Sequence, residues 1–199
     1  SDAHPMMKAL YYRLYFGVTL SNYYLENVKG DDNETLTMRA EARFMRAMFM
    51  YYLMDLYGNV PIKTSVSSES TPQSSRSEVF AFVEKELKDI VGDGEGNEVL
   101  ADKRATYGRA DKVAGWILLS RLYLNAEVYT GSAQWQKAKD YADKAIKGGY
   151  SLCTEGKNGY SAYQLLFMGD NDTNGAQNEI VLPAIHDGME TQTWGGCLF

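Results

Sequence analysis

The chain has 199 residues, with 20 Lys and Arg against 26 Asp and Glu, a formal net charge of -6, and 45% hydrophobic residues. This composition is typical of a folded domain with a core, and the acidic balance argues against a nucleic-acid groove, which needs clustered Lys and Arg. No apolar run reaches the roughly 18 residues of a membrane-spanning helix, and 2 His and 2 Cys argue against a His-rich metal site, a His-centred triad or a disulfide scaffold.

The first half of the chain predicts three helices. Apolar residues recur at helical spacing from about Pro5 to Val28. Glu34 to Tyr57 has almost no helix breaker and ends at Gly58, a stop signal. After an extended Ser/Thr-rich connection, Ser75 and Glu78 have the spacing of a capping box, which predicts a third helix to about residue 91.

Two more helices are expected in the second half. The segment from residue 108 or 109 to Tyr129 is apolar nearly all round, which is typical of a helix buried in a bundle. The next helix follows Gly131, ends at Gly148, and carries large and small apolar residues on one face: Trp135, Ala138, Ala142 and Ala145. From residue 150 onward the chain is rich in loops, with a short helix or turn near 163–168 and a predicted strand over 179–183.

The last two long helices have the pattern of a tetratricopeptide repeat. Trp116-x2-Leu119-Ser120-x2-Tyr123 follows the opening of that motif, and Ala138 and Ala145 match the small residues of its second helix. The fold class predicted is therefore mostly α, with antiparallel helical hairpins, irregular loops and a short strand near the C-terminus. Trp116 and Trp135 are expected to be buried between the members of one hairpin.

Three blocks of sequence go beyond a generic helical repeat. They are AEARFMRA at 40–47 continuing to DLYGNVPI at 55–62, the segment 108–124, and the segment 135–152. In this order and spacing the blocks resemble the SusD/RagB family of outer-membrane nutrient-binding lipoproteins. SNYYL at 21–25 and NEIV at 178–181 are similar to the helix before the first block and the strand after the third in that family.

The resemblance implies a non-catalytic function. It implies a cell-surface lipoprotein of the outer membrane that binds a glycan or other nutrient for hand-over to a SusC-type TonB-dependent transporter, without a cofactor. Residues 1–199 would form a single SusD-like helical region of a longer protein, because no signal peptide or N-terminal lipid-modified Cys is present; neither Cys153 nor Cys197 is near the start. The alternative is a tetratricopeptide scaffold that binds a protein or peptide.

The best candidate for a ligand contact is Trp194. It lies with Gln192 in a polar, glycine-rich stretch, and a loop Trp offers a broad face to a sugar ring while Gln192 offers a polar contact. The other aromatic residues at helical packing positions are expected to fill the core: Tyr11, Tyr12, Tyr15, Tyr51, Tyr52 and Tyr123.

Two polar features are interpreted as structural. Arg46 is expected to pair inside the bundle, and Arg43 to cover apolar surface with its stem. Asp170, Asp172 and Asn174, followed by Gly, match the first half of a calcium loop, but Val181 stands where that loop needs Glu. These three residues are a weak metal candidate, and a solvated turn is the simpler interpretation. No catalytic constellation is present in the pattern.

Overall fold

The computed structural model describes residues 4–104, 106–186 and 189, which fall into two compact units. The first unit contains the described residues up to 103 together with 110–148, and the second contains the described residues of 104–109 and those from 149 onward. That residues 1–199 act as a single region stays a prediction.

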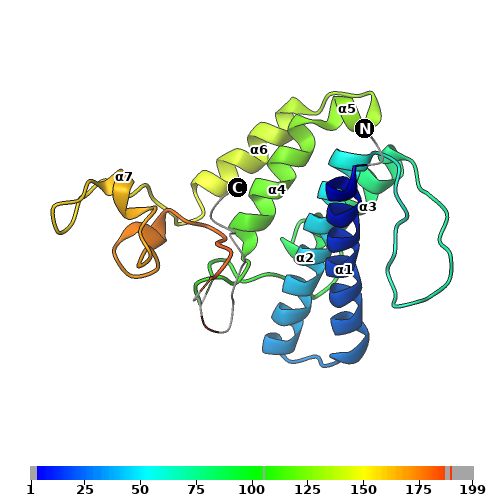
Figure 1. The fold of residues 1–199 in the computed structure, drawn as a ribbon, viewed down its shortest axis with the longest axis horizontal. Coiled ribbons are helices and arrows are strands. Elements are labelled where there is room, and N and C mark those ends of the chain that lie inside the picture. The colour runs from blue at the N-terminus through cyan, green and yellow to red at the C-terminus, as the bar shows by residue number, and fades with distance from the viewer. Residues whose placement is uncertain (1–3, 105, 187–188, 190–199) are drawn as a thin grey trace. The chain divides into compact units, whose positions relative to one another are not determined.

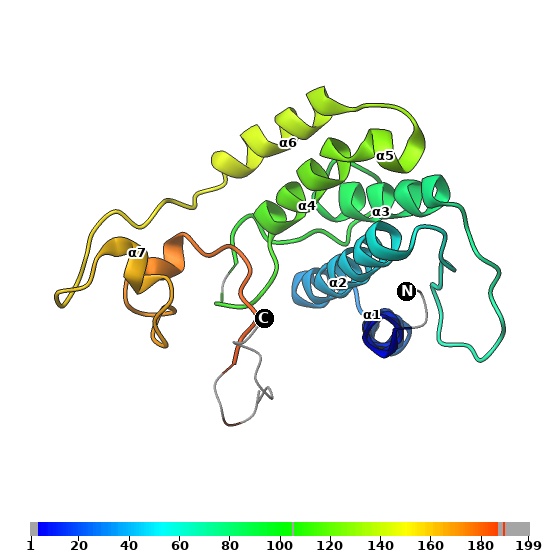
Figure 2. The same cartoon turned by 45° about the horizontal axis from the view of Figure 1, so that its top comes forward.

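Helices dominate the described part of the chain (Figure 1). The first unit contains α1 (Pro5–Asn27), α2 (Asn33–Tyr57), α3 (Arg76–Ile90), α4 (Lys112–Leu124), α5 (Ala126–Thr130) and α6 (Trp135–Ile146), and the second contains α7 (Ala162–Leu165) and a 3₁₀ turn (Ala176–Asn178). In the first unit α1 packs on α2, α2 on α3 and α4 on α6, and α3 also contacts α4 and α5. Figures 1 and 2 show α1 lying along α2. The predicted class of helical hairpins is confirmed.

The helix ends follow from local capping chemistry. The predicted capping box of α3 is present, since the Glu78 amide donates to Ser75 Oγ (3.3 Å) and the Ser75 amide donates to Glu78 Oε2 (2.7 Å). Helix α2 ends where expected, because Gly58 adopts φ +79°, a conformation that residues with a side chain rarely take. At the other end of α2, Asp32 accepts a hydrogen bond from the Thr35 amide (2.9 Å).

The helix predicted from 108 or 109 to Tyr129 is shorter and is interrupted. Asp111 caps its start by accepting from the Ala114 amide (3.0 Å), so α4 begins at Lys112. Asn125 breaks it with φ −98° and ψ 10°, and α5 starts at the next residue. Asn is a weak helix former because its amide competes for backbone groups, and here Asn125 Nδ2 donates to the Arg121 carbonyl (3.3 Å).

The predicted strand at 179–183 is wrong. The described residues of this segment have no partner strand, and the bridges found elsewhere are isolated pairs, Val60 with Ser74 and Lys157 with Tyr160. Arg104 binds this part of the chain instead of a partner strand. Its guanidinium donates to the Val181 carbonyl within the segment and to the Gln177 carbonyl (2.8 Å) just before it. An apolar run with β propensity forms a strand only when a second edge is available to it.

The core of the first unit lies where α2, α3 and α4 meet. Fully buried side chains come from all three: Met50, Leu53, Met54, Leu87, Ile90, Leu119 and Leu122. The expected burial of the two tryptophans is wrong for Trp135, which is 63% exposed at the first position of α6. Trp116 is half-buried, and its indole Nε1 is buried without a hydrogen-bond partner among the described residues.

Candidate functional site

The candidate ligand contacts from the sequence are not placed by the structure. Trp194 and Gln192 lie outside the described residues, so their role stays a prediction. The candidate site is therefore built from the remaining polar clusters, hollows and exposed aromatic side chains, taken unit by unit.

The arginines of α2 are tied into a buried ion network. Arg46 donates to Glu86 Oε2 through Nη2 (2.5 Å) and to Asn22 Oδ1 through Nη1 (2.9 Å), which confirms the expected pairing inside the bundle. Arg43 was expected to cover apolar surface, but it pairs with Glu86 (2.8 Å) and Asp89 (2.9 Å). Pairing dominates because a buried guanidinium without a carboxylate partner is costly.

The network also reaches the loop after α3. Arg39 pairs with Glu98 (2.6 Å), and Arg43 lies 3.4 Å from the same carboxylate. Burial alone would raise the pKa of Asp89, but hydrogen bonds from Lys85 and Arg43 outweigh it and hold that pKa below its ordinary value. Because these arginines satisfy carboxylates of the protein, they form a structural clamp between α2 and α3 and are not available for a ligand.

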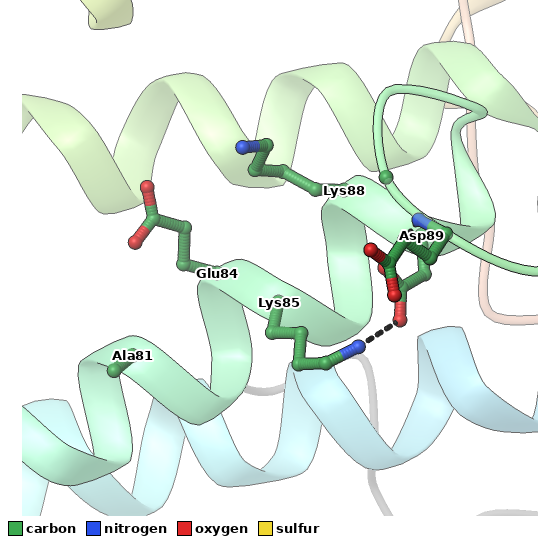
Figure 3. Close-up of a pocket in the computed structure, with 7 residues that line it drawn as sticks. Ala81, Glu84, Lys85, Lys88 and Asp89 are labelled. Carbon is green, nitrogen blue, oxygen red and sulfur yellow. Dashed lines mark hydrogen bonds and ion pairs between the residues drawn. The ribbon is translucent and has the colours of Figure 1, made fainter.

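A charged hollow lies beside this network (Figure 3). Its volume is about 320 Å³ and it is lined by Ala81, Glu84, Lys85, Lys88, Asp89, Gly94 and Glu95. Figure 3 shows Lys85 reaching Asp89, a contact of 2.7 Å, while Glu84 and Lys88 extend from another side of α3. No aromatic ring is among the lining residues, so the hollow offers mixed charge and no flat apolar surface.

In the second unit, the loop with the incomplete calcium pattern is held together by its own side chains. Asn174 Nδ2 donates to Asp170 Oδ1 (3.0 Å) and to the Leu165 carbonyl (2.9 Å), and its Oδ1 accepts from the Ala176 amide (3.0 Å). Asp172 lies exposed on the same turn. The structure brings Asp170 and Asn174 together, but in a hydrogen bond that orders the turn. Within the described residues, no three acidic, His or Cys side chains are grouped to hold a metal.

A polar trough of about 370 Å³ runs beside this turn. Two stretches line it: Ser151, Leu152, Cys153, Thr154, Glu155, Gly156 and Lys157 on one side, and Asn174, Gly175 and Asn178 on the other. The two stretches are joined where the Ser151 amide donates to the Asn178 carbonyl (3.1 Å) and the Cys153 amide donates to Glu179 Oε2 (2.7 Å). The trough is therefore a built feature of the second unit.

Two exposed aromatic residues lie in the segment of α7, which is joined to the trough residue Asn174 by the hydrogen bond to Leu165: Tyr163 within the helix and Phe167 two residues after its end. Tyr163 is 71% exposed and Phe167 is 73% exposed, and their ring centroids are 5.1 Å apart with the planes tilted by 60°. Sequence reasoning missed this pair. The signal was present as two aromatic residues four positions apart in a polar, loop-rich region, where no core is available to bury them.

The expectation that the helical tyrosines fill the core is only partly correct. Tyr51 and Tyr123 are buried, and Tyr123 stacks on Tyr141 (5.6 Å between centroids). Tyr12, however, is 59% exposed. It begins an apolar stripe along the outer side of α1, formed by Tyr12, Phe16, Leu20 and Tyr23, each more than half exposed. Because α1 carries aromatic residues on more than one side, periodicity alone does not indicate which side packs on α2.

None of the helices among the described residues has the length and apolarity needed to cross a bilayer. Comparison with known proteins relates the sequence to one family. A SusD-like family model, described as starch-binding and associating with the outer membrane, matches residues 2–124. The starch-binding protein SusD of Bacteroides thetaiotaomicron is 40% identical over 192 residues, which cover 96% of this chain and 33% of that protein.

Solved structures give the same fold. A SusD-like protein from Bacteroides fragilis superposes with a TM-score of 0.73 at 23% identity, covering 94% of this chain and 35% of that one. A laminarin-binding SusD-like protein superposes with a TM-score of 0.69 at 21% identity, covering 87% of this chain and 36% of that one. The chain thus spans about a third of the length of these relatives.

Proposed function

The chain belongs to the SusD-like family of starch-binding proteins that associate with the outer membrane, and from this premise we propose that the protein binds a glycan at the cell surface without cleaving it. The observation that carries the proposal is the 40% identity to a starch-binding protein, which extends over 96% of the chain. An α-glucan of the starch type is the first ligand to test. A β-glucan is the second, because the laminarin-binding relative shares the fold.

The chemistry of the described surface supports binding of a neutral, polyhydroxylated ligand. Sugars present apolar C–H faces, which stack on aromatic rings, and hydroxyl groups, which both donate and accept hydrogen bonds. The second unit offers both kinds of surface, the exposed rings of Tyr163 and Phe167 and the polar trough. The charged hollow of the first unit offers only the polar kind.

We also propose that the bound glycan is handed over to a SusC-type TonB-dependent transporter in the outer membrane. The exposed stripe on α1 supports a protein contact of this kind. Tyr12, Phe16, Leu20 and Tyr23 present a continuous apolar surface along one helix, and such patches are typical of protein interfaces. Outer-membrane attachment through a lipid belongs to the same proposal.

Binding is tested by titrating maltoheptaose into the purified protein and, in parallel, by measuring reducing ends released from soluble starch. We expect saturable binding and no release of sugar. Release of sugar products would contradict a binding-only function. Binding of neither maltoheptaose nor a laminarin oligosaccharide would contradict the proposed ligand class.

Trp194 and Gln192 are the proposed contacts from the sequence. Replacing Trp194 by Ala should weaken maltoheptaose binding roughly tenfold, because a stacked ring and an indole N–H donor are both lost. Trp135→Ala is the matched control, since Trp135 is 63% exposed on α6, and it should bind like the wild type. If Trp194→Ala lowers the melting temperature and leaves binding intact, Trp194 is a packing residue.

A further inference from the structure

The exposed aromatic pair, Tyr163 on α7 and Phe167 just after it, lies in a segment that hydrogen bonds hold at both ends of the helix. The capping box at the start of α7 links Ser161 and Gln164. At its end, two side-chain amides donate to backbone carbonyls: Asn174 Nδ2 to Leu165 (2.9 Å) and Asn171 Nδ2 to Leu166 (3.0 Å). The segment that carries Tyr163 and Phe167 is therefore closed by hydrogen bonds at both ends of α7.

The trough adjoins this helix at both ends. Lys157 exchanges two backbone hydrogen bonds with Tyr160 (3.0 Å each), the residue before the capping Ser161. Asn174 lines the trough on the other side and is bonded to Leu165 of α7. Helix α7 has only 4 residues, about 6 Å along its axis at 1.5 Å per residue. The trough is therefore bonded to both ends of the short segment that carries Tyr163, and Phe167 follows two residues after that segment.

The lining of the trough has hydrogen-bonding capacity that the protein does not use. Within residues 149–186, the side chains of Thr154, Lys157 and Asn178 line the trough and take part in no hydrogen bond or ion pair. They supply a hydroxyl, an ammonium and an amide, so donors and acceptors are both present. A volume of about 370 Å³ is at the small end of the range of ligand pockets.

The ligand class follows from what the site offers and what it lacks. The trough has no net charge that would favour an anion or a metal ion, since its lining contains one cation, Lys157, and one carboxylate, Glu155. A protein partner would favour a continuous apolar patch, whereas the two rings are bordered by the exposed polar residues Ser161 and Gln164. Two rings beside a set of free hydroxyl, amide and ammonium groups match the alternation of apolar faces and hydroxyls along an oligosaccharide.

We propose that Tyr163, Phe167 and the trough formed by residues 151–157 and 174–178 are a carbohydrate subsite of the protein. This inference rests on the proposed glycan-binding function and gives it a location separate from Trp194. One or two sugar units stack on the rings of Tyr163 and Phe167, and the adjoining units place hydroxyls against Thr154, Lys157 and Asn178. The rings supply most of the affinity, and the trough fixes the direction of the chain.

The test compares two double variants of the same chemistry. Tyr163→Ala/Phe167→Ala should weaken maltoheptaose binding roughly tenfold, since two stacking contacts are removed. The matched control is Tyr12→Ala/Phe16→Ala on α1, which removes a Tyr and a Phe that are also four positions apart and are 59% and 52% exposed. The control should bind like the wild type, and both variants should keep the wild-type circular dichroism spectrum.

Cys153 gives an independent readout. Its thiol lies in the lining of the trough and is not in a disulfide. Saturating maltoheptaose should slow alkylation of Cys153 by iodoacetamide at least threefold in the wild type, and this protection should be lost in Tyr163→Ala/Phe167→Ala. The peptide that carries Cys153 is followed by mass spectrometry.

The outcomes separate this inference from the general function. If the wild type binds maltoheptaose or a laminarin oligosaccharide, but the α7 variant binds equally well and Cys153 is not protected, the subsite is wrong and glycan binding stands. If both double variants lose binding to the same degree, the effect is not specific to α7 and the subsite is again wrong. If the wild type binds neither glycan, the subsite fails together with the proposed function.

Discussion

Asp89 shows at the scale of a single residue how the first unit tolerates buried charge. It is 6% exposed and accepts hydrogen bonds from Arg43 Nη2 (2.9 Å), Lys85 Nζ (2.7 Å) and the Glu95 amide (3.1 Å). Every donor favours the ionised carboxylate, so the network costs little to bury as long as Asp89 keeps its charge. The loop after α3 is held by the same side chain.

Acid should therefore weaken the fold through this residue. Because the pKa of Asp89 is lower in the folded than in the unfolded chain, its contribution is complete above the unfolded value of about 4 and is lost as pH falls toward the folded value. Asp89→Asn should lower the free energy of unfolding by about 2 kcal/mol at pH 7. The deficit should shrink below about pH 4. Urea titrations across pH measure both effects.

The control for this prediction is Asp31→Asn, an exposed aspartate in the loop before α2. It should change the free energy of unfolding by less than about 0.5 kcal/mol at both pH 7 and pH 3. A deficit of Asp89→Asn that is the same at pH 7 and pH 3 would contradict the role of its charge.

At the scale of the element, the sequence correctly predicted the helix ends that are decided by a few neighbouring residues. The capping box of Ser75 and the glycine stop at Gly58 were found because a few neighbouring residues specify them. The break at Asn125 was missed, since an isolated Asn is compatible with helix until packing decides. The strand at 179–183 was wrong because no second edge pairs with this segment among the described residues, and the Val181 carbonyl accepts from Arg104, more than 70 positions earlier. The exposure of Trp135 follows from its place at the first position of α6, which periodicity alone does not report.

Helices α1 and α2 approach each other closely at Gly17. A Cβ added there would lie 2.4 Å from Phe49 Cε2. Gly17→Ala gains up to about 1 kcal/mol of helix propensity. The clash should nevertheless make the variant less stable by about 1–2 kcal/mol net. Chemical denaturation measures the difference.

A compensating variant makes this prediction specific. Gly17→Ala/Phe49→Leu should be more stable than Gly17→Ala, because the shorter side chain removes the ring atoms that collide with the new methyl group. If Gly17→Ala is more stable than the wild type, the two helices have room to separate, and the close approach is not a constraint.

Helix α6 packs on α4 through Ala138, which is 6% exposed and whose carbonyl accepts from Ser120 Oγ (2.8 Å). Ala138→Leu should overpack this contact and cost about 2 kcal/mol. Ala142 was predicted to belong to the same face but is only half-buried, so Ala142→Leu should cost less. Melting temperatures of the two variants test the order. Equal values would show that α6 contacts α4 along its whole length.

At the scale of the whole molecule, the two units differ in how much apolar surface they bury. Among the described residues of the second unit, the buried apolar side chains are Leu165 and Ala176, whereas the first unit buries apolar side chains from each of α1 to α6. The second unit is thus held together mainly by hydrogen bonds between its polar groups.

Amide hydrogen exchange should reveal this difference. We expect the amides of α2, α3 and α4 to exchange slowly and those of residues 151–178 to exchange orders of magnitude faster, because local opening needs little apolar exposure there. Saturating maltoheptaose should slow exchange in residues 151–178 if the ligand binds the trough. Equal protection of the two units without ligand would contradict the difference in their cores.

The split course of the chain has a consequence for the order of folding. Arg104 and its acceptor Gln177 are 73 positions apart, and the α4–α6 hairpin lies between them. Val113 and Gly148 touch within that hairpin, since a Cβ on Gly148 would lie 2.3 Å from Val113 Cγ2. Once the hairpin has formed, the effective loop between Arg104 and Gln177 is shorter. The entropic cost of closing that loop is therefore smaller. We therefore expect the α4–α6 hairpin to form before the contacts of Arg104 with Gln177 and Val181 during folding.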